Sequence, residues 1–179
     1  MTDRTELLLS GMGGQGIVFA GKLLAEAAAL HAGYEAVQTI RYSPEVRGGE
    51  SVSEIIISPN PIDYPRVIQM DAALVLSPIN LALYRNCFKP DARIVLDSEL
   101  PFNELSPGWK LIRLPLTTLW KRPNLAGLGG LLAVLEPLLP ATALLAALRS
   151  HLAPAAFEVN QKAFIAGFNA GKAVTRSFF

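Results

Sequence analysis

Two glycine-rich loops contain the residues of this sequence whose types and spacing could do chemistry. The first reads Gly-Met-Gly-Gly-Gln-Gly at residues 11–16 and satisfies the pattern G-x-G-x-x-G. Such glycines let the backbone approach a phosphate closely, and a helix that follows them directs free N–H groups toward it. Glycines also permit a tight turn without any ligand. Four glycines and a glutamine in six residues exceed what a turn needs, so we expect a ligand or a partner backbone against this loop.

The second loop, residues 41–51, reads Arg-Tyr-Ser-Pro-Glu-Val-Arg-Gly-Gly-Glu-Ser. Arg47 presents five hydrogen-bond donors beside two glycines, an arrangement that suits a phosphate or a carboxylate. Taken alone, these residues are also compatible with a simple ion pair between Arg47 and Glu45 or Glu50 on a solvated loop.

A dinucleotide site is a competing hypothesis for the first loop. Such a site has an Asp or Glu about 20 residues further on, at the end of the second strand, to hold the ribose. Here the second predicted strand ends near Arg41 with no acid at its tip, and Arg41 could hold the 2′-phosphate of NADP. The alternative function is therefore a free-standing NADP-binding reductase or sensor.

Alternating strands and helices must position these loops. The predicted strands are residues 6–10, 36–41, 52–58, 72–77, 93–97 and 110–114, and the predicted helices are residues 17–31, 80–89, 124–135, 141–151 and 155–176. This order is typical of a single α/β domain over residues 1–179, with three layers, a largely parallel sheet, a Rossmann-like opening and a helical C-terminal third. We expect both loops at the carboxyl ends of adjacent strands, where α/β sheets bind ligands. Asp71 and Asp97 flank strands and could reach the same edge, but the sequence identifies no partner that an active-site carboxylate needs.

The composition excludes several classes of protein. Hydrophobic residues make up 51% of the 179 residues and charged residues 17%, which excludes a disordered chain. Sixteen basic and fifteen acidic residues give a net charge of +1, so we expect no nucleic acid partner. So few charges suggest a surface kept for a protein partner, or a self-contained homodimer.

Individual residues limit which cofactors this chain could bind and whether it could span a membrane. One cysteine, Cys87, allows neither an internal disulfide nor an iron–sulfur cluster, and two distant histidines predict no metal site. Glu136 and two prolines interrupt the longest apolar run, so no membrane span is expected. Residues 1–10 lack the apolar stretch of a signal peptide, which predicts a cytoplasmic location.

Together, the two loops resemble the gamma subunit, or gamma domain, of the 2-oxoacid:ferredoxin oxidoreductases. The resemblance rests on Gly-x-Gly-Gly-Gln-Gly followed by Ser-Pro-Glu-Val-Arg-Gly-Gly-Glu-Ser at residues 43–51. It extends to an Asn-x-x-x-Leu-Gly helix start at Asn124 and to a closing helix within residues 157–171. One departure is the connection at residues 114–123, which is shorter than the family's usual one.

The resemblance implies a division of labour in anaerobic metabolism. The family oxidatively decarboxylates a 2-oxoacid with coenzyme A, giving acyl-CoA, CO₂ and reduced ferredoxin. Thiamine diphosphate with Mg²⁺ would be bound by alpha and beta subunits, and 4Fe–4S clusters by a ferredoxin-like delta subunit. This chain would bind no cofactor tightly and be inactive alone, although it could form a homodimer when isolated. Its role would be assembly and the positioning of coenzyme A, with 2-oxoglutarate as the first substrate choice and pyruvate as the second.

The resemblance also assigns one face of this chain to a ligand or to a neighbouring subunit, with no catalytic or metal-binding residue. The residues implied for this face are Gly11, Gly13, Gly14, Gln15, Gly16, Ser43, Pro44, Glu45, Arg47, Gly48, Gly49 and Glu50.

Overall fold

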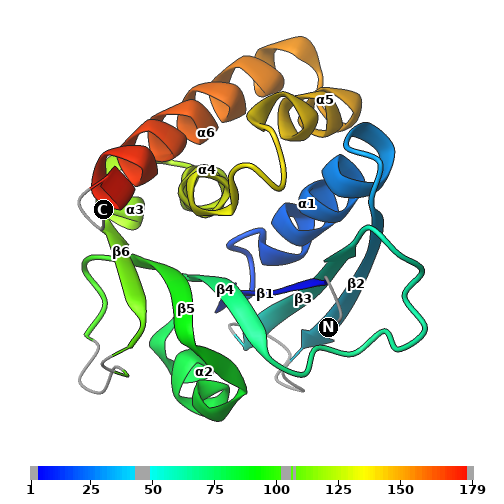
Figure 1. Cartoon of the computed structure of the whole chain (residues 1–179). Coiled ribbons are helices and arrows are strands. Elements are labelled where there is room, and N and C mark those ends of the chain that lie inside the picture. Colours follow the sequence, from blue (N-terminus) through cyan, green and yellow to red (C-terminus); the bar gives the residue numbers. More distant parts are fainter. Residues whose placement is uncertain (1–3, 43–48, 102–105, 107, 177–179) are drawn as a thin grey trace.

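A six-stranded sheet in the order β2-β3-β1-β4-β5-β6 forms the centre of the computed structural model (Figure 1). The structure describes residues 4–42, 49–101, 106 and 108–176. The strands are β1 (Thr5–Met12), β2 (Glu35–Tyr42), β3 (Glu50–Ser58), β4 (Met70–Val75), β5 (Phe88–Asp97) and β6 (Lys110–Leu114). The helices are α1 (Ile17–His31), α2 (Pro78–Leu83), α3 (Leu116–Leu119), α4 (Pro123–Leu135), α5 (Ala141–His151) and α6 (Pro154–Thr175), with a 3₁₀ turn η1 at Arg85–Cys87.

Five of the six strands run in one direction, and β3 runs against them. The prediction of a largely parallel sheet is confirmed, since β1, β4, β5 and β6 pair in parallel. However, β3 lies between β1 and β2 and is antiparallel to both. The strands that lead into the two loops are therefore not adjacent, and the Rossmann-like opening is limited to β1, the glycine loop and α1. A direct β2–β3 hairpin is possible because antiparallel neighbours need only a short connection.

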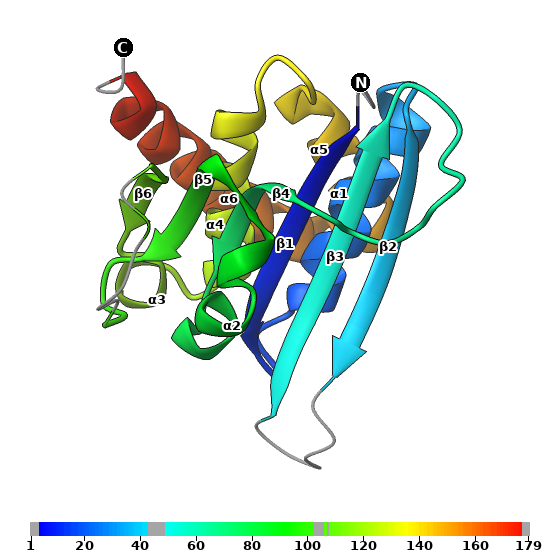
Figure 2. The ribbon, with the colours of Figure 1, turned by 60° about the horizontal axis from the view of Figure 1, so that its bottom comes forward.

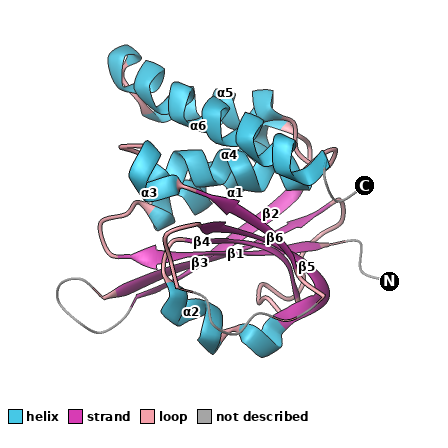
Figure 3. Ribbon diagram, turned by 90° about the vertical axis from the view of Figure 1, so that its left-hand side faces the viewer, coloured by secondary structure: helices cyan, strands magenta, loops and turns pink. Residues whose placement is uncertain are grey.

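Helices cover the two faces of the sheet unequally (Figure 3). α1 and α4 lie on one face with α5 and α6 packed outside them, and α2 lies on the other face. Along β1, Leu7 and Leu9 join the core beneath α1 and α4, whereas Leu8 joins a smaller core on the α2 side. This alternation follows from the two-residue repeat of a strand. The predicted three-layer α/β fold is confirmed, with one of its helical layers doubled.

α4 is enclosed on all sides, with twelve of its thirteen residues buried. It lies between the sheet and α6, and glycines let the two helix backbones touch. A Cβ atom added to Gly167 would lie 1.9 Å from the carbonyl oxygen of Ala126, and one added to Gly129 would lie 2.1 Å from that of Phe164. Glycine is required at both positions because only its missing side chain leaves room for the opposing backbone.

Two connections differ from the predicted elements. The predicted helix at residues 80–89 is wrong in its second half, because α2 ends at Leu83 and β5 begins at Phe88. The short connection after β6 forms the one-turn helix α3. The carboxylate of Asp97 accepts hydrogen bonds from the N–H groups of Leu116 (3.2 Å) and Thr117 (2.9 Å) at the start of this helix.

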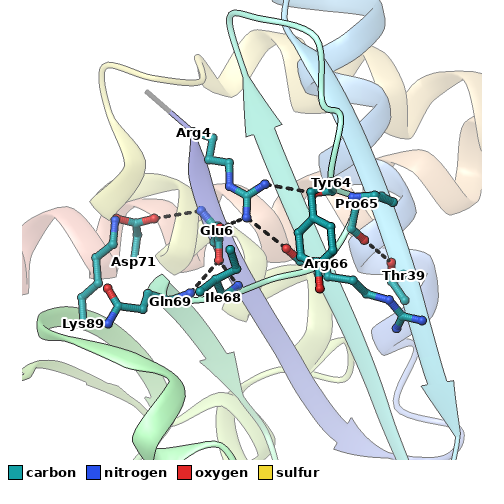
Figure 4. A network of polar contacts seen from close by, with 10 residues as sticks. All are labelled: Arg4, Glu6, Thr39, Tyr64, Pro65, Arg66, Ile68, Gln69, Asp71 and Lys89. Atoms are coloured by element: carbon teal, nitrogen blue, oxygen red, sulfur yellow. Dashed lines mark hydrogen bonds and ion pairs between the residues drawn. The ribbon is translucent and has the colours of Figure 1, made fainter. Parts of the chain in front are cut away.

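The connection from β3 to β4, residues 59–69, crosses the α2 side of the sheet and is fastened by Glu6 (Figures 2 and 4). Glu6 is buried, and its Oε2 accepts hydrogen bonds from the N–H groups of Ile68 and Gln69, the latter at 2.8 Å. Its Oε1 forms an ion pair with Arg4. The Arg4 guanidinium also donates to two carbonyl groups of the same connection, those of Tyr64 and Arg66, each at 3.0 Å. One carboxylate thus ties the first strand to this connection.

Candidate functional site

The two predicted loops meet at the carboxyl end of β1, the lower end of the sheet in Figure 2. The N–H of Gly13 donates a hydrogen bond of 2.8 Å to the carbonyl of Gly49, directly beyond the pairing of Met12 with Glu50. A Cβ atom on Gly13 would lie 3.2 Å from the Gly49 oxygen, so glycine favours this contact. The antiparallel strand β3 brings the loops together, in place of the adjacent parallel strands that the sequence predicted.

The predicted site residues are brought together as far as the structure describes them. Gly11 and Met12 end β1, residues 13–16 form the turn to α1, and Gly49 lies directly before Glu50, the first residue of β3. The predicted residues Ser43, Pro44, Glu45, Arg47 and Gly48 lie outside the described residues.

Two side chains hold the glycine loop in place, those of Gln15 within the loop and of Asn124 from α4. The N–H of Met12 donates to Oε1 of Gln15 at 2.6 Å, and the N–H of Gln15 donates to the carbonyl of Met12 at 3.1 Å. From a third element, Nδ2 of Asn124 donates to the carbonyl of Gly16 at 3.3 Å. Asn124 therefore joins the start of α4 to the start of α1. In the sequence Asn124 stands out only as part of the Asn-x-x-x-Leu-Gly motif, and it is not among the predicted site residues.

These hydrogen bonds bear on phosphate binding by the loop. The N–H groups of Met12, Gly13 and Gln15 already have partners within the chain. A phosphate at this position would therefore depend on other N–H groups of the loop and of the first turn of α1.

The NADP hypothesis is disfavoured by the sheet order. A dinucleotide site needs the end of the second strand beside the first strand, but β3 separates β2 from β1 here. Arg41, the residue suggested for the 2′-phosphate, instead forms an ion pair of 3.0 Å with Glu54. Nε2 of Gln38, on the same strand, donates to the carbonyl of Val18 in α1, so the Gln38 side chain faces α1. Arg41 is three residues further on, and side chains alternate between the faces of a strand, so Arg41 lies on the face opposite α1.

A polar cluster lies on the α2 side next to this edge. Oγ of Ser77 donates to Oε1 of Glu50 at 3.0 Å. Burial raises the pKa of the Tyr84 hydroxyl above 10; the nearby Arg41 guanidinium opposes this rise, and the Glu54 carboxylate adds to it. The Arg41 guanidinium also lies 5.8 Å from the centre of the Tyr84 ring.

Two buried oxygens of this cluster are unsatisfied. Among the described residues, neither Oγ of Ser10 nor Oε2 of Glu54 has a hydrogen-bond partner. Neither residue is among the predicted site residues. The signal available was the register: Leu8 pairs with Glu54 and Ser10 with Val52, so two polar residues lie at diagonal positions on the α2 side of β1 and β3.

The two aspartates that could have reached the ligand edge have other positions. Asp97 lies at the carboxyl end of β5 but is fully buried, with its oxygens turned to the start of α3. Asp71 is the second residue of β4, at the opposite end of the strands, so it does not reach the ligand edge. It accepts a hydrogen bond of 2.8 Å from the N–H of Glu6 and pairs with Lys89 (Figure 4).

The part of the chain that the structure describes carries no membrane-spanning helix and no metal-ligand cluster. None of the helices there combines the length and the apolar character needed to cross a membrane. In the same part of the chain, His, Cys, Asp and Glu side chains do not gather in threes at a metal-binding distance. Cys87 is half-buried against the core on the α2 side.

Gly16→Ala is expected to destabilise the chain more than Gly33→Ala does. Both glycines have φ of 75°, so alanine incurs the same backbone cost at each, about 1–2 kcal/mol. At Gly33 the added Cβ meets open space, but at Gly16 it would lie 2.5 Å from Nδ2 of Asn124. We expect urea denaturation to show a further loss of about 1–2 kcal/mol for Gly16→Ala.

The Asn124→Ala variant completes a double-mutant cycle for this contact. In the Gly16→Ala/Asn124→Ala double variant the clash is absent, so its loss of stability should be smaller than the sum of the two single losses. Equal losses for Gly16→Ala and Gly33→Ala, with strict additivity in the cycle, would show that Asn124 does not clamp the loop.

Comparisons with known proteins agree with the family resemblance that the two loops carry. The family model for pyruvate ferredoxin/flavodoxin oxidoreductase matches residues 6–170. The chain is 35% identical to the 2-oxoglutarate synthase subunit KorC of Archaeoglobus fulgidus, over 98% of this chain and 92% of that protein. It is 45% identical to the KorC subunit of Methanocaldococcus jannaschii over 104 residues, 58% of this chain and 56% of that protein. The chain thus spans about half the length of that relative and of two Methanothermobacter KorC subunits.

Solved structures share the fold. The gamma subunit of a keto/oxoacid ferredoxin oxidoreductase from Geobacter sulfurreducens has a TM-score of 0.82 at 35% identity, over 96% of this chain and 98% of that one. The 2-oxoglutarate:ferredoxin oxidoreductase of Magnetococcus marinus was solved with 2-oxoglutarate, coenzyme A and succinyl-CoA bound. It has a TM-score of 0.84 at 20% identity over 99% of this chain and 32% of that one, a likeness of fold alone. On the match over residues 6–170 and the full-length similarity to the Archaeoglobus subunit, this chain belongs to the pyruvate ferredoxin/flavodoxin oxidoreductase family.

Proposed function

We propose that this chain is the gamma subunit of a multi-subunit 2-oxoacid:ferredoxin oxidoreductase. The observation that carries the proposal is the hydrogen bond between Gly13 and Gly49, which joins the two loops of the family resemblance at one edge of the sheet. The first substrate choice is 2-oxoglutarate, because the four curated relatives carry the name 2-oxoglutarate synthase. Pyruvate is the second choice.

The redox chemistry of this enzyme is assigned to partner subunits. One cysteine in 179 residues cannot hold an iron–sulfur cluster, so electron transfer must use clusters bound elsewhere. We therefore assign thiamine diphosphate and Mg²⁺ to alpha and beta subunits and 4Fe–4S clusters to a ferredoxin-like delta subunit. The cofactors supply the decarboxylation and the electron transfer, and the protein supplies their positions.

A location in the cytoplasm stays a prediction.

The edge formed by residues 11–16 and 49–50 is assigned to the thiamine-bearing subunits and to coenzyme A. The glycines leave backbone exposed there, with Gly13 and Gly14 at the surface, and the start of α1 is the positive end of a helix dipole. A phosphate of coenzyme A is the kind of group that such an edge can accept. Arg47, two residues before Gly49 in the sequence, would add a bidentate donor.

Purification of the tagged chain from its own host under anaerobic conditions tests the assembly. We expect stoichiometric recovery of thiamine-binding subunits and of a cysteine-rich iron–sulfur protein, identified by mass spectrometry. The recovered complex should reduce ferredoxin with 2-oxoglutarate and coenzyme A faster than with pyruvate. Recovery of the chain alone, with NADP raising its melting temperature, would instead support the reductase or sensor.

The role in coenzyme A binding needs a separate kinetic test on the assembled complex. Arg47→Ala should raise the KM for coenzyme A about tenfold, the effect of losing one charge-assisted contact, and leave the KM for the 2-oxoacid unchanged. Lys162→Ala, at an exposed position of α6, is the control and should change neither value. Unchanged kinetics and unchanged assembly in Arg47→Ala would remove Arg47 from the site.

A further inference from the structure

The short helix α2 presents apolar side chains to solvent on the thinly covered side of the sheet. Leu81 of this helix is buried against the sheet. Ile79 and Leu83, however, have exposed fractions of 56% and 71%, and Ala82 is exposed beside them. Residues three and four positions apart lie on one face of a helix, so these three side chains form a continuous apolar strip, the α2 strip.

This pattern differs from that of an ordinary surface helix. The outer face of a surface helix carries polar or charged residues, whereas a helix that is apolar on both faces is normally buried. The outer helices of this chain follow the rule, with Arg149 of α5 and Lys162 of α6 at exposed positions. Around α2, in contrast, the sequence has no charged residue from Ala72 to Tyr84. Depletion of charge is typical of the centre of a protein–protein interface.

The fold leaves the α2 strip uncovered. In Figure 3, α2 stands below the sheet, whereas α1, α4, α5 and α6 lie above it in two layers. The apolar residues of α2 are grouped on one face of the helix and not scattered singly over the surface. Grouped apolar side chains on a surface mark a site of protein association.

The α2 strip adjoins the edge formed by residues 11–16 and 49–50. Ser77, directly before α2, donates a hydrogen bond of 3.0 Å from Oγ to Oε1 of Glu50 at that edge. Met12 pairs with Glu50 in the sheet and is itself exposed. Its side chain points to the α2 side, because it lies four residues after Leu8, which packs in the core there. The edge and the strip therefore belong to one side of the molecule and meet at the hydrogen bond between Ser77 and Glu50.

We propose that the α2 strip and Met12 form the docking surface for a thiamine-bearing subunit, which covers them with apolar side chains of its own. This proposal rests on the function proposed above and adds to it a surface outside the glycine loops. α2 has six residues and is about 9 Å long, too short to supply alone the roughly 800 Å² that each partner buries in a stable interface. A partner on the strip needs a second contact area, and the adjoining edge is already assigned to that subunit.

A large partner subunit fits these observations better than a second copy of this chain does. A second copy on the strip would need the adjoining edge as well, and it would exclude the thiamine-bearing subunits from that edge. The same fold is also found joined to a larger body, since it accounts for 32% of the Magnetococcus marinus chain.

Hydroxyl-radical footprinting of the wild-type chain tests the surface without any substitution. The chain is oxidised once in isolation and once in the complex purified under anaerobic conditions. We expect Ile79 and Leu83 to be oxidised in the isolated chain and to lose this oxidation in the complex. Leu30 is the internal control, because it has the same exposed fraction as Leu83, 71%, and ends α1 on the other side of the sheet. Equal oxidation of Leu83 in both samples would overturn the proposal.

Leu83→Glu and its matched control Leu30→Glu test the same surface by assembly. Both leucines lie in the last turn of a helix, so the two substitutions affect the isolated chain similarly, and equal melting temperatures verify that both variants are folded. Leu83→Glu would bury an unpaired charge in the interface and should reduce recovery of the thiamine-binding subunits about tenfold or more. Leu30→Glu should recover them as the wild type does.

The possible failures of this experiment are distinguishable. Full recovery with Leu83→Glu, or equal loss with both variants, would overturn the docking surface while the wild-type complex still supports the proposed function. If Leu83→Glu enters the complex and also converts a dimer of the isolated chain to a monomer, the strip belongs to a second copy and the proposal is overturned. Absence of the thiamine-binding subunits from the wild-type purification would overturn the proposed function, and the docking surface with it.

Discussion

Gly167→Ala is expected to lower the free energy of unfolding by about 3 kcal/mol, at the upper end of the usual cost of overpacking a core. The new Cβ atom would lie 1.9 Å from the oxygen and 2.5 Å from the carbonyl carbon of Ala126, both backbone atoms of α4. Neither can rotate away, so α4 and α6 must move apart along their contact. Alanine is the better helix former by at most about 1 kcal/mol, which does not compensate. Urea denaturation followed by circular dichroism measures the loss.

Asn169→Ala is the matched control for this variant. It lies two residues further along α6 at an exposed position, so it gains helix propensity without any clash. We expect it to leave the stability unchanged or slightly raised. A loss for Gly167→Ala no larger than the change for Asn169→Ala would mean that the two helices are not in backbone contact.

Glu6→Ala is expected to cost about 3–5 kcal/mol, the usual effect of removing one partner of a buried ion pair. The variant would leave the Arg4 guanidinium and the N–H groups of Ile68 and Gln69 without their shared carboxylate (Figure 4). The loss should be local before it is global, because the affected groups belong to residues 59–69. Hydrogen exchange at Ile68 and Gln69 should therefore accelerate more than exchange in the strands.

Two further variants define the cause of that effect. Glu6→Gln keeps an acceptor oxygen for the N–H groups and loses only the charge. Its free energy of unfolding should therefore lie between those of the wild type and Glu6→Ala. Glu35→Ala removes an exposed carboxylate from the start of β2 and should change the stability by less than about 0.5 kcal/mol. If Glu6→Ala resembled Glu35→Ala, the connection would be held by its own packing and not by Glu6.

The sequence was informative where structure depends on near neighbours in the chain. The boundaries of α1, β6 and α5 match the predictions, because glycine, proline and apolar spacing fix them locally. The position of β3 could not be predicted, since a run of β-branched residues identifies a strand but not its neighbours. The end of α2 was missed for a related reason: Phe88 begins β5, where it pairs with Met70 of β4 and packs edge-on against Trp109, and neither partner is its near neighbour in the sequence.

The same distinction applies to the candidate site. Spacing identified the glycine loop and the residues that begin β3, both of which are local motifs. It could not show that Asn124 would reach Gly16, since these residues are joined only through the packing of α4 beside α1. Nor could it show that Arg41 would turn to Glu54, because that contact depends on which strand lies beside β2.

The burial of α4 has a consequence for how the chain folds. Its neighbours are the sheet on one side and α6 on the other, so α4 cannot reach its native surroundings until residues from both halves of the sequence are in place. Formation of the central helix is therefore coupled to formation of the whole molecule, and a fragment ending before α6 would expose an apolar helix that favours aggregation. The amide protons of α4 should exchange with solvent only through complete unfolding, which makes this helix the natural reporter of global stability.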